Sequence, residues 1–164
     1  WWKRWRRASP RCSVGRIPAW WTPTFARTPI SCSSRWARAA GLARDVADEL
    51  RAAGKRAGVL RIRYLRPMPD AALARALVDA AAVGVLEQDI SFGGTGTVYA
   101  NVLASLARAG VVRPSANFIG GLGGDDISRE AMRGAFAHLE ALAAGEGASG
   151  EVVFFGVEEE GGKR

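Results

Sequence analysis

Acidic residues are missing from the first part of this chain, in which no aspartate or glutamate occurs before Asp45. Residues 1–38 nevertheless contain nine basic residues, all six tryptophans and both cysteines. Residues 39–164 carry 14 basic and 16 acidic residues, a net charge of −2, so the +7 of the whole chain comes from its first segment. The overall basic charge is therefore no argument for nucleic-acid binding by the longer part of the chain.

Cysteine, histidine and long apolar runs are also scarce, and each shortage excludes a class of site. Cys12 and Cys32 form no CxxC pair, so neither a zinc site nor a redox motif is predicted. His138 is the only histidine, and no Ser-His-Asp set can be assembled around it. No run of about 18 apolar residues occurs, so we expect no membrane-spanning helix. The lack of cysteine after residue 38 is typical of a cytoplasmic protein.

Residues 1–38 show neither helical nor strand periodicity, and three interpretations of them stand. Translation of a GC-rich gene in the wrong frame gives much Arg, Pro, Ala, Ser, Trp and Cys and few acids, and we favour this frameshift. The second interpretation is a basic arm for nucleic acid or an anionic membrane, and the third is a transit peptide. Four prolines interrupt any long helix: Pro10, Pro18, Pro23 and Pro29. We expect the segment to be aberrant or disordered, because it has too little patterned apolar surface to form a core.

From residue 39 onward, segments with helical periodicity alternate with short apolar runs. Asp70 and Ser128 are placed to cap the helices that follow them. The predicted helices cover residues 41–53, 71–81, 98–110 and 128–144, and the predicted strands cover residues 58–65, 82–86, 115–119 and 152–155.

This alternation predicts a three-layer α/β fold with a mostly parallel sheet. The series begins with a helix, although a strand should precede it. We expect this first strand, due between residues 30 and 40, to be missing. The chain is therefore divided into a leader (1–38), one α/β domain (39–157) and a solvated tail (158–164).

A glycine-rich loop over residues 88–96 follows a buried strand and precedes a helix, the place where open α/β sheets bind ligands. Neither GxGxxG nor GxxxxGK[ST] occurs in it, so the nucleotide fingerprints are absent. A tight turn is the simplest interpretation; an anion contact or a subunit interface is the functional one. The residues we select for that contact are Asp89, Ser91, Phe92, Gly93, Gly94 and Thr95.

Three other features contain residue types that can carry chemistry, but we assign no catalytic or metal-binding residue in them. Glu87 and Asp89 resemble a carboxylate pair for acid–base work, but such residues more often cap a turn or bind a partner. Residues 120–126 contain only two carboxylates, which favours a turn and helix entry over a metal site. His138, on a predicted helix, is expected to be a structural or surface residue.

Several segments resemble the C-terminal part of the alpha subunit of pyruvate:ferredoxin oxidoreductase. In one of them this chain has Leu65-Arg66-Pro67-Met68-Pro69, where the family usually reads Arg-Pro-Phe-Pro. The order and spacing of the segments carry the resemblance, which extends over most of residues 39–156. The other segments are residues 39–50, 55–63, 83–93 and 118–127.

The resemblance implies a domain like the C-terminal domain of transketolase (domain II) in a complex that decarboxylates pyruvate oxidatively to acetyl-CoA. It also implies thiamine diphosphate, magnesium and iron–sulfur clusters in the whole complex, with coenzyme A and ferredoxin as partners. The family's catalytic motifs lie in other domains or subunits, so none is transferred to this chain. We therefore expect a fragment with a structural and interface role, inactive alone and binding neither membrane nor nucleic acid. The alternative is a non-enzymatic α/β module whose Trp/Arg arm grips nucleic acid or membrane.

Overall fold

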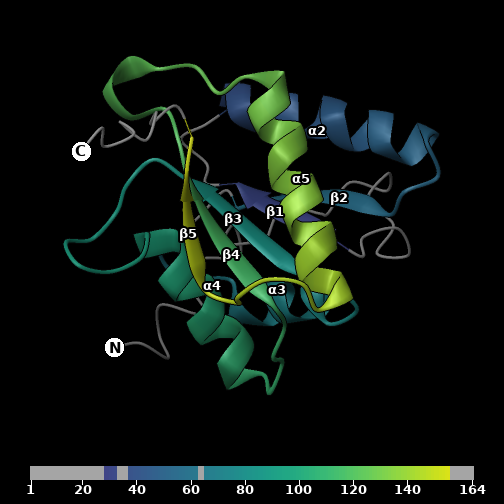
Figure 1. The fold of residues 1–164 in the computed structure, drawn as a ribbon. Coiled ribbons are helices and arrows are strands. Elements are labelled where there is room, and N and C mark those ends of the chain that lie inside the picture. The colour runs from purple at the N-terminus through teal and green to yellow at the C-terminus, as the bar shows by residue number, and fades with distance from the viewer. Residues whose placement is uncertain (1–27, 33–36, 63–64, 156–164) are drawn as a thin grey trace, which may run out of the picture.

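The computed structural model describes residues 28–32, 37–62 and 65–155. The predictions for residues 1–27 and for the tail 158–164 lie outside these ranges. Strands and helices alternate along the described chain (Figure 1). In order they are β1 (Thr28–Cys32), α2 (Ala37–Ala52), β2 (Ala57–Arg61), α3 (Asp70–Leu77), β3 (Val83–Glu87), α4 (Thr97–Arg108), β4 (Ser115–Ile119), a short 3-10 helix η2 (Leu122–Gly124), α5 (Arg129–Ala144) and β5 (Glu151–Phe154).

The five strands form one parallel sheet in the order β2-β1-β3-β4-β5. β1 is central: Ile30 pairs with Val59 of β2 on one side and with Gly84 of β3 on the other. The chain moves from β1 to β2 in one direction and then adds β3, β4 and β5 on the other side of β1. The strand order therefore reverses between β1 and β3, the topological switch point at which ligands of open α/β sheets bind.

Helices cover both faces of the sheet, as Figure 1 shows. α2 and α5 pack on one face around a core that includes Phe118 and Phe136. α3 and α4 pack on the other face around Val83, Val85 and Leu77. The predicted three-layer α/β fold with a parallel sheet is thus confirmed. No helix in the described part of the chain combines the length and apolarity needed to cross a bilayer.

The prediction that the opening strand is missing is wrong. Residues 28–32 form β1, within the segment that we assigned to the leader. The sequence Thr-Pro-Ile-Ser-Cys has no apolar run, and a proline argues against a central strand because it lacks a backbone N–H. Pairing with β2 and β3 on both sides stabilises a strand that periodicity alone does not reveal. The division of the chain at residue 38 otherwise stays a prediction.

The ends of α5 are predictable from the local sequence, whereas the start of α3 is not. Ser128 caps α5 as predicted: its Oγ accepts a hydrogen bond from the backbone N–H of Ala131 at 3.0 Å. Gly145 ends the same helix with a left-handed φ of 87°, a conformation in which glycine is favoured. Asp70 begins α3 but makes no capping bond within it. Its carboxylate serves a different contact, described below.

Candidate functional site

The loop over residues 88–96 leaves β3 at the carboxyl edge of the sheet and leads into α4. β3 is buried along its whole length, which fixes the start of the loop. The loop is one of the two that flank the switch point between β1 and β3; the other, residues 33–36, lies outside the described residues. The glycine-rich loop therefore lies where the fold would place a ligand.

The carboxylate of Glu87, at the end of β3, closes the amino end of α4. Its Oε2 accepts a hydrogen bond from the backbone N–H of Val98 at 2.7 Å, and its Oε1 accepts one from Tyr99 at 2.9 Å. The positive end of the helix dipole favours a negative group there. Burial of the side chain nevertheless raises the pKa of Glu87 above its ordinary value, against the opposing effect of these hydrogen bonds.

Asn117, in the middle of β4, completes this network. Its Nδ2 donates to Oε1 of Glu87 at 2.9 Å and to the backbone oxygen of Val85 at 3.2 Å. Its Oδ1 accepts from the backbone N–H of Gly96 at 2.7 Å. Because Glu87 and Asn117 are fully buried, each needs such partners to offset the loss of water. We name Glu87, Asn117 and Gly96 the helix-closing network.

The helix-closing network argues against the prediction that this loop binds an anion. The amides of Gly96, Val98 and Tyr99 already donate to protein side chains. An anion at the end of α4 would have to compete with a fixed internal carboxylate. The sequence leaves Glu87 as an acid–base residue, a turn cap or a partner contact; in the structure its carboxylate caps the amino end of α4. Asn117 was not predicted as a site residue, although an Asn inside an otherwise buried strand is a signal for such a network.

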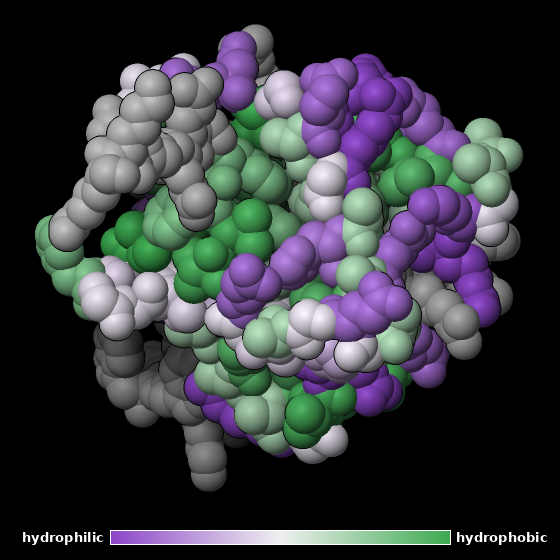
Figure 2. All heavy atoms as spheres, in the orientation of Figure 1, coloured by the Kyte–Doolittle hydropathy of each residue, from purple (hydrophilic) through white to green (hydrophobic). Residues whose placement is uncertain are grey.

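The tip of the loop is folded on itself and presented to solvent. The backbone N–H of Ser91 donates to the oxygen of Thr95 at 3.2 Å, and that of Gly94 donates to the oxygen of Ser91 at 3.0 Å. Gly93 takes a φ of 66° in this turn, which few other residues adopt. Of the six residues predicted for a contact, Thr95 is half-buried and the other five are exposed. Figure 2 shows apolar side chains gathered around the position that β5 takes in Figure 1.

The second glycine-rich loop, residues 120–126, joins the first. The side-chain amide of Gln88 donates to the backbone oxygen of Gly121. Asp125 and Asp126 are exposed, and no group of three or more His, Cys, Asp or Glu side chains gathers within the described residues. The loop forms the turn η2 and leads into α5.

His138 lies on α5 and contacts the neighbouring strands β4 and β5. Its ring meets the ring of Phe118 edge-on, with centroids 5.7 Å apart. Its Nε2 lies 3.6 Å from Oε2 of Glu151, at the start of β5. These contacts are those of a packing residue between helix and strand.

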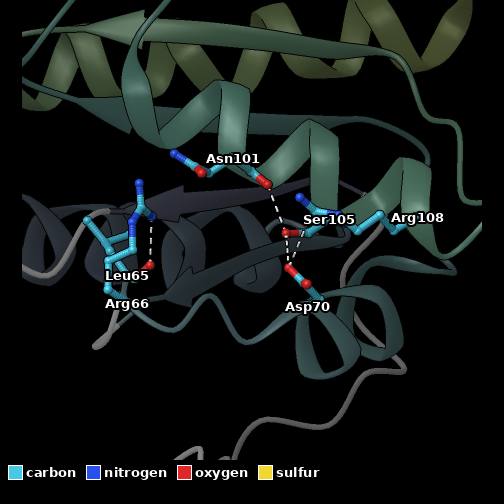
Figure 3. Close-up of polar contacts among 6 residues, drawn as sticks. All are labelled: Leu65, Arg66, Asp70, Asn101, Ser105 and Arg108. Carbon is cyan, nitrogen blue, oxygen red and sulfur yellow. Dashed lines mark hydrogen bonds and ion pairs between the residues drawn. The ribbon is translucent and has the colours of Figure 1, made fainter. Parts of the chain in front are cut away.

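The prediction that Asp70 caps α3 is wrong, because its carboxylate contacts α4 (Figure 3). Its Oδ1 accepts a hydrogen bond from Oγ of Ser105 at 2.6 Å and lies 3.3 Å from a guanidinium nitrogen of Arg108. Ser105 is fully buried and lies 2.8 Å from the backbone oxygen of Asn101 in the same helix. The carboxylate therefore joins α3 to α4 rather than capping α3. This role requires the packing of the two helices, because Asp70 and Ser105 are 35 residues apart in the sequence.

Comparison with known proteins identifies the domain. The sequence model of the family "Pyruvate:ferredoxin oxidoreductase core domain II" matches residues 35–132. The chain is 37% identical over 115 residues to the alpha subunit of an NADH-dependent phenylglyoxylate dehydrogenase from Aromatoleum evansii, covering 70% of this chain. It is 36% identical over 118 residues to the pyruvate synthase subunit PorA of Methanothermobacter thermautotrophicus, covering 71% of this chain.

A third relative is the ketoisovalerate oxidoreductase subunit VorA of Pyrococcus horikoshii, 30% identical over 88 residues, or 54% of this chain. The matched regions span 28%, 28% and 22% of these three relatives, so the chain corresponds to about a quarter of each. The buried β3 and both glycine-rich loops lie within the residues matched by the family. The chain therefore belongs to the pyruvate:ferredoxin oxidoreductase core domain II family.

Proposed function

We propose that this chain is domain II of the alpha subunit of a 2-oxoacid oxidoreductase, and that it serves as a structural and interface element without catalytic residues of its own. Family membership supports the first part of this proposal. The relatives are named as subunits of a phenylglyoxylate dehydrogenase, a pyruvate synthase and a ketoisovalerate oxidoreductase, and the acid in each name is a 2-oxoacid. The matched family favours this function over a nucleic-acid or membrane-binding module.

The helix-closing network is the observation that supports a structural role without catalytic residues. At the switch point, a helix end that would suit a cofactor phosphate is occupied by Glu87 and Asn117. A domain that fills this position with its own side chains is suited to scaffolding. The exposed residues of the loop, Asp89 and Ser91 to Gly94, then provide a contact surface for the rest of the enzyme.

Pyruvate is the proposed substrate of the whole complex, with coenzyme A as acyl acceptor and ferredoxin as electron acceptor. Thiamine diphosphate, magnesium and iron–sulfur clusters are the proposed cofactors, and the cytoplasm is the proposed location. The described residues of this chain do not fit these groups: the amides at the end of α4 are engaged, and no acidic or cysteine cluster lies among the described residues. We therefore derive no catalytic step through them in this domain.

Purification from the native host tests the proposal. The tagged chain should bring with it a beta-type oxidoreductase subunit, and the complex should oxidise pyruvate in the presence of coenzyme A and an artificial electron acceptor. 2-Oxoisovalerate and phenylglyoxylate are to be compared as substrates. The chain by itself should show no activity. A chain that purifies without oxidoreductase subunits, and binds DNA or anionic vesicles in a salt-sensitive manner instead, contradicts the proposal.

A further inference from the structure

Large apolar side chains are exposed at one edge of the sheet. Among the described residues, six large hydrophobic side chains are exposed, and four of them follow or end the neighbouring strands β3, β4 and β5 at their carboxyl ends. We name these four the edge surface; they are Ile90 (39% exposed), Phe92 (109%), Leu122 (38%) and Phe154 (43%). Single exposed hydrophobics need no explanation, whereas several at one edge of a sheet are a feature of interaction sites.

The register of the sheet explains why Phe154 remains partly exposed. Glu87, Ile119 and Phe154 are paired in one row across β3, β4 and β5. Glu87 faces α4, which covers this side of β3, whereas Phe154 at the edge of the sheet stays partly exposed. In Figure 2, hydrophobic atoms are exposed around the position that β5 takes in Figure 1.

The loop that carries Phe92 is fixed in place before any partner binds. One end of the loop is fixed by the helix-closing network, and the other by the bond from Gln88 to Gly121. The turn between Ser91 and Thr95 closes the tip. An aromatic side chain on such a preorganised loop loses little conformational freedom on binding, which is typical of interface hot spots.

The charged side chains of the two loops that carry the edge surface are all acidic. No lysine or arginine occurs between Arg75 and Arg108 or between Arg113 and Arg129, the stretches that contain both loops. Asp89 and Asp125 are exposed there. A partner that covers this edge must therefore offer an apolar pocket with a basic rim, because complementary charge steers association.

We infer that the edge surface docks another subunit of the oxidoreductase, one with an apolar pocket for Phe92 and Lys or Arg side chains opposite Asp89 and Asp125. The inference rests on the proposed function, since that function supplies the partner subunit. It adds the place of contact and the chemistry of the partner.

Binding of the full chain to the purified beta-type subunit from the same organism tests this inference. Phe92→Ser should raise the Kd at least about tenfold, as expected for a hot spot. Val112→Ser is the matched control, because Val112 is 82% exposed but precedes β4 at the opposite edge of the sheet. Asp89→Asn should lower the sensitivity of the Kd to salt. Thermal unfolding of each variant verifies that the fold is kept.

The outcomes separate the inference from the function on which it rests. Equal binding by wild type and Phe92→Ser overturns the inference and leaves the proposed function intact. No binding by the wild-type chain overturns both. A Phe92-dependent dimer of the chain alone, with beta-subunit binding unchanged by Phe92→Ser, assigns the surface to a second copy and also overturns the inference.

Discussion

Gly96 and Glu87 approach each other so closely that a Cβ atom on Gly96 would lie 2.0 Å from Oε1 of Glu87. The carboxylate cannot withdraw, because Val98, Tyr99 and Asn117 all donate hydrogen bonds to it. The φ of Gly96 is −62°, an angle open to any residue. The glycine is therefore required by the space that Glu87 occupies and not by backbone conformation.

Gly96→Ala is expected to destabilise the domain by about 1–3 kcal/mol, the usual cost of an added methyl group in a packed site. The clash would separate Glu87 from the end of α4 or displace the helix. Urea unfolding followed by circular dichroism measures the change in free energy.

Gly134→Ala is the control for this change. Gly134 lies within α5, and a Cβ atom there meets nothing within 4 Å. The substitution should stabilise the domain by about 0.5–1 kcal/mol, because alanine favours the helix interior. A loss of stability at both positions would show that the site at Gly96 is not special.

Glu87→Gln should change how stability depends on pH. Burial raises the pKa of Glu87 in the folded protein, so between its ordinary pKa and the raised one the folded state binds more protons than the unfolded chain. The contribution of Glu87 to stability is therefore fully present below the ordinary pKa and falls as pH rises through the folded value. The free energy of unfolding of wild type minus that of Glu87→Gln should decrease with rising pH in this window. An increase would mean that hydrogen bonding outweighs burial.

Glu49 on α2 is exposed, and its pKa is shifted in the opposite direction to that of Glu87. It pairs with Arg129 and Arg133 of α5, and hydrogen bonding to Arg133 is the main reason why its pKa is lowered. Its contribution to stability is present above the ordinary pKa and lost as pH falls through the lowered value. Glu49→Gln should give a small loss of Tm at low salt that disappears near about 1 M NaCl, where surface charges are screened. A loss that persists in high salt would indicate packing instead.

Ser105→Ala should cost about 1 kcal/mol, the typical net value of one hydrogen bond. The hydroxyl group is buried between Asp70 and the backbone oxygen of Asn101. Arg108→Gln should cost less than about 0.5 kcal/mol, since the Arg108–Asp70 pair is exposed to solvent. Chemical denaturation of both variants compares them directly. A larger effect for Arg108 would assign the α3–α4 contact to charge rather than to the buried hydroxyl.

Sequence alone was sufficient where a feature depends on adjacent residues. Ser128 and the strand over residues 115–119 were predicted at the positions found, because a cap or an apolar run is a local signal. Asp70 has the same local signal as Ser128, but Ser105 and Arg108 lie nearby in space and take its carboxylate. A capping residue is therefore predictable only when no distant donor competes for it.

The candidate site was predictable in place but not in detail. The loop after β3 was selected because parallel strands gather loops at one edge of the sheet. The pairing of Glu87 with Asn117 depends on the register of β3 against β4, because a one-residue shift of either strand would place the two side chains on opposite faces of the sheet. No pattern within either segment specifies that register. The hydrogen bonds that cap α4 could therefore be found only in the folded structure.

β1, the first strand in the sequence, connects the two parts of the sheet. β2 lies at one edge and has β1 as its only neighbour, while β3, β4 and β5 extend from the other side of β1. Deleting residues 28–32 would therefore not merely shorten the sheet. It would divide the sheet into a three-stranded part and a single strand without a partner, so five residues at the start of the domain hold its two halves together.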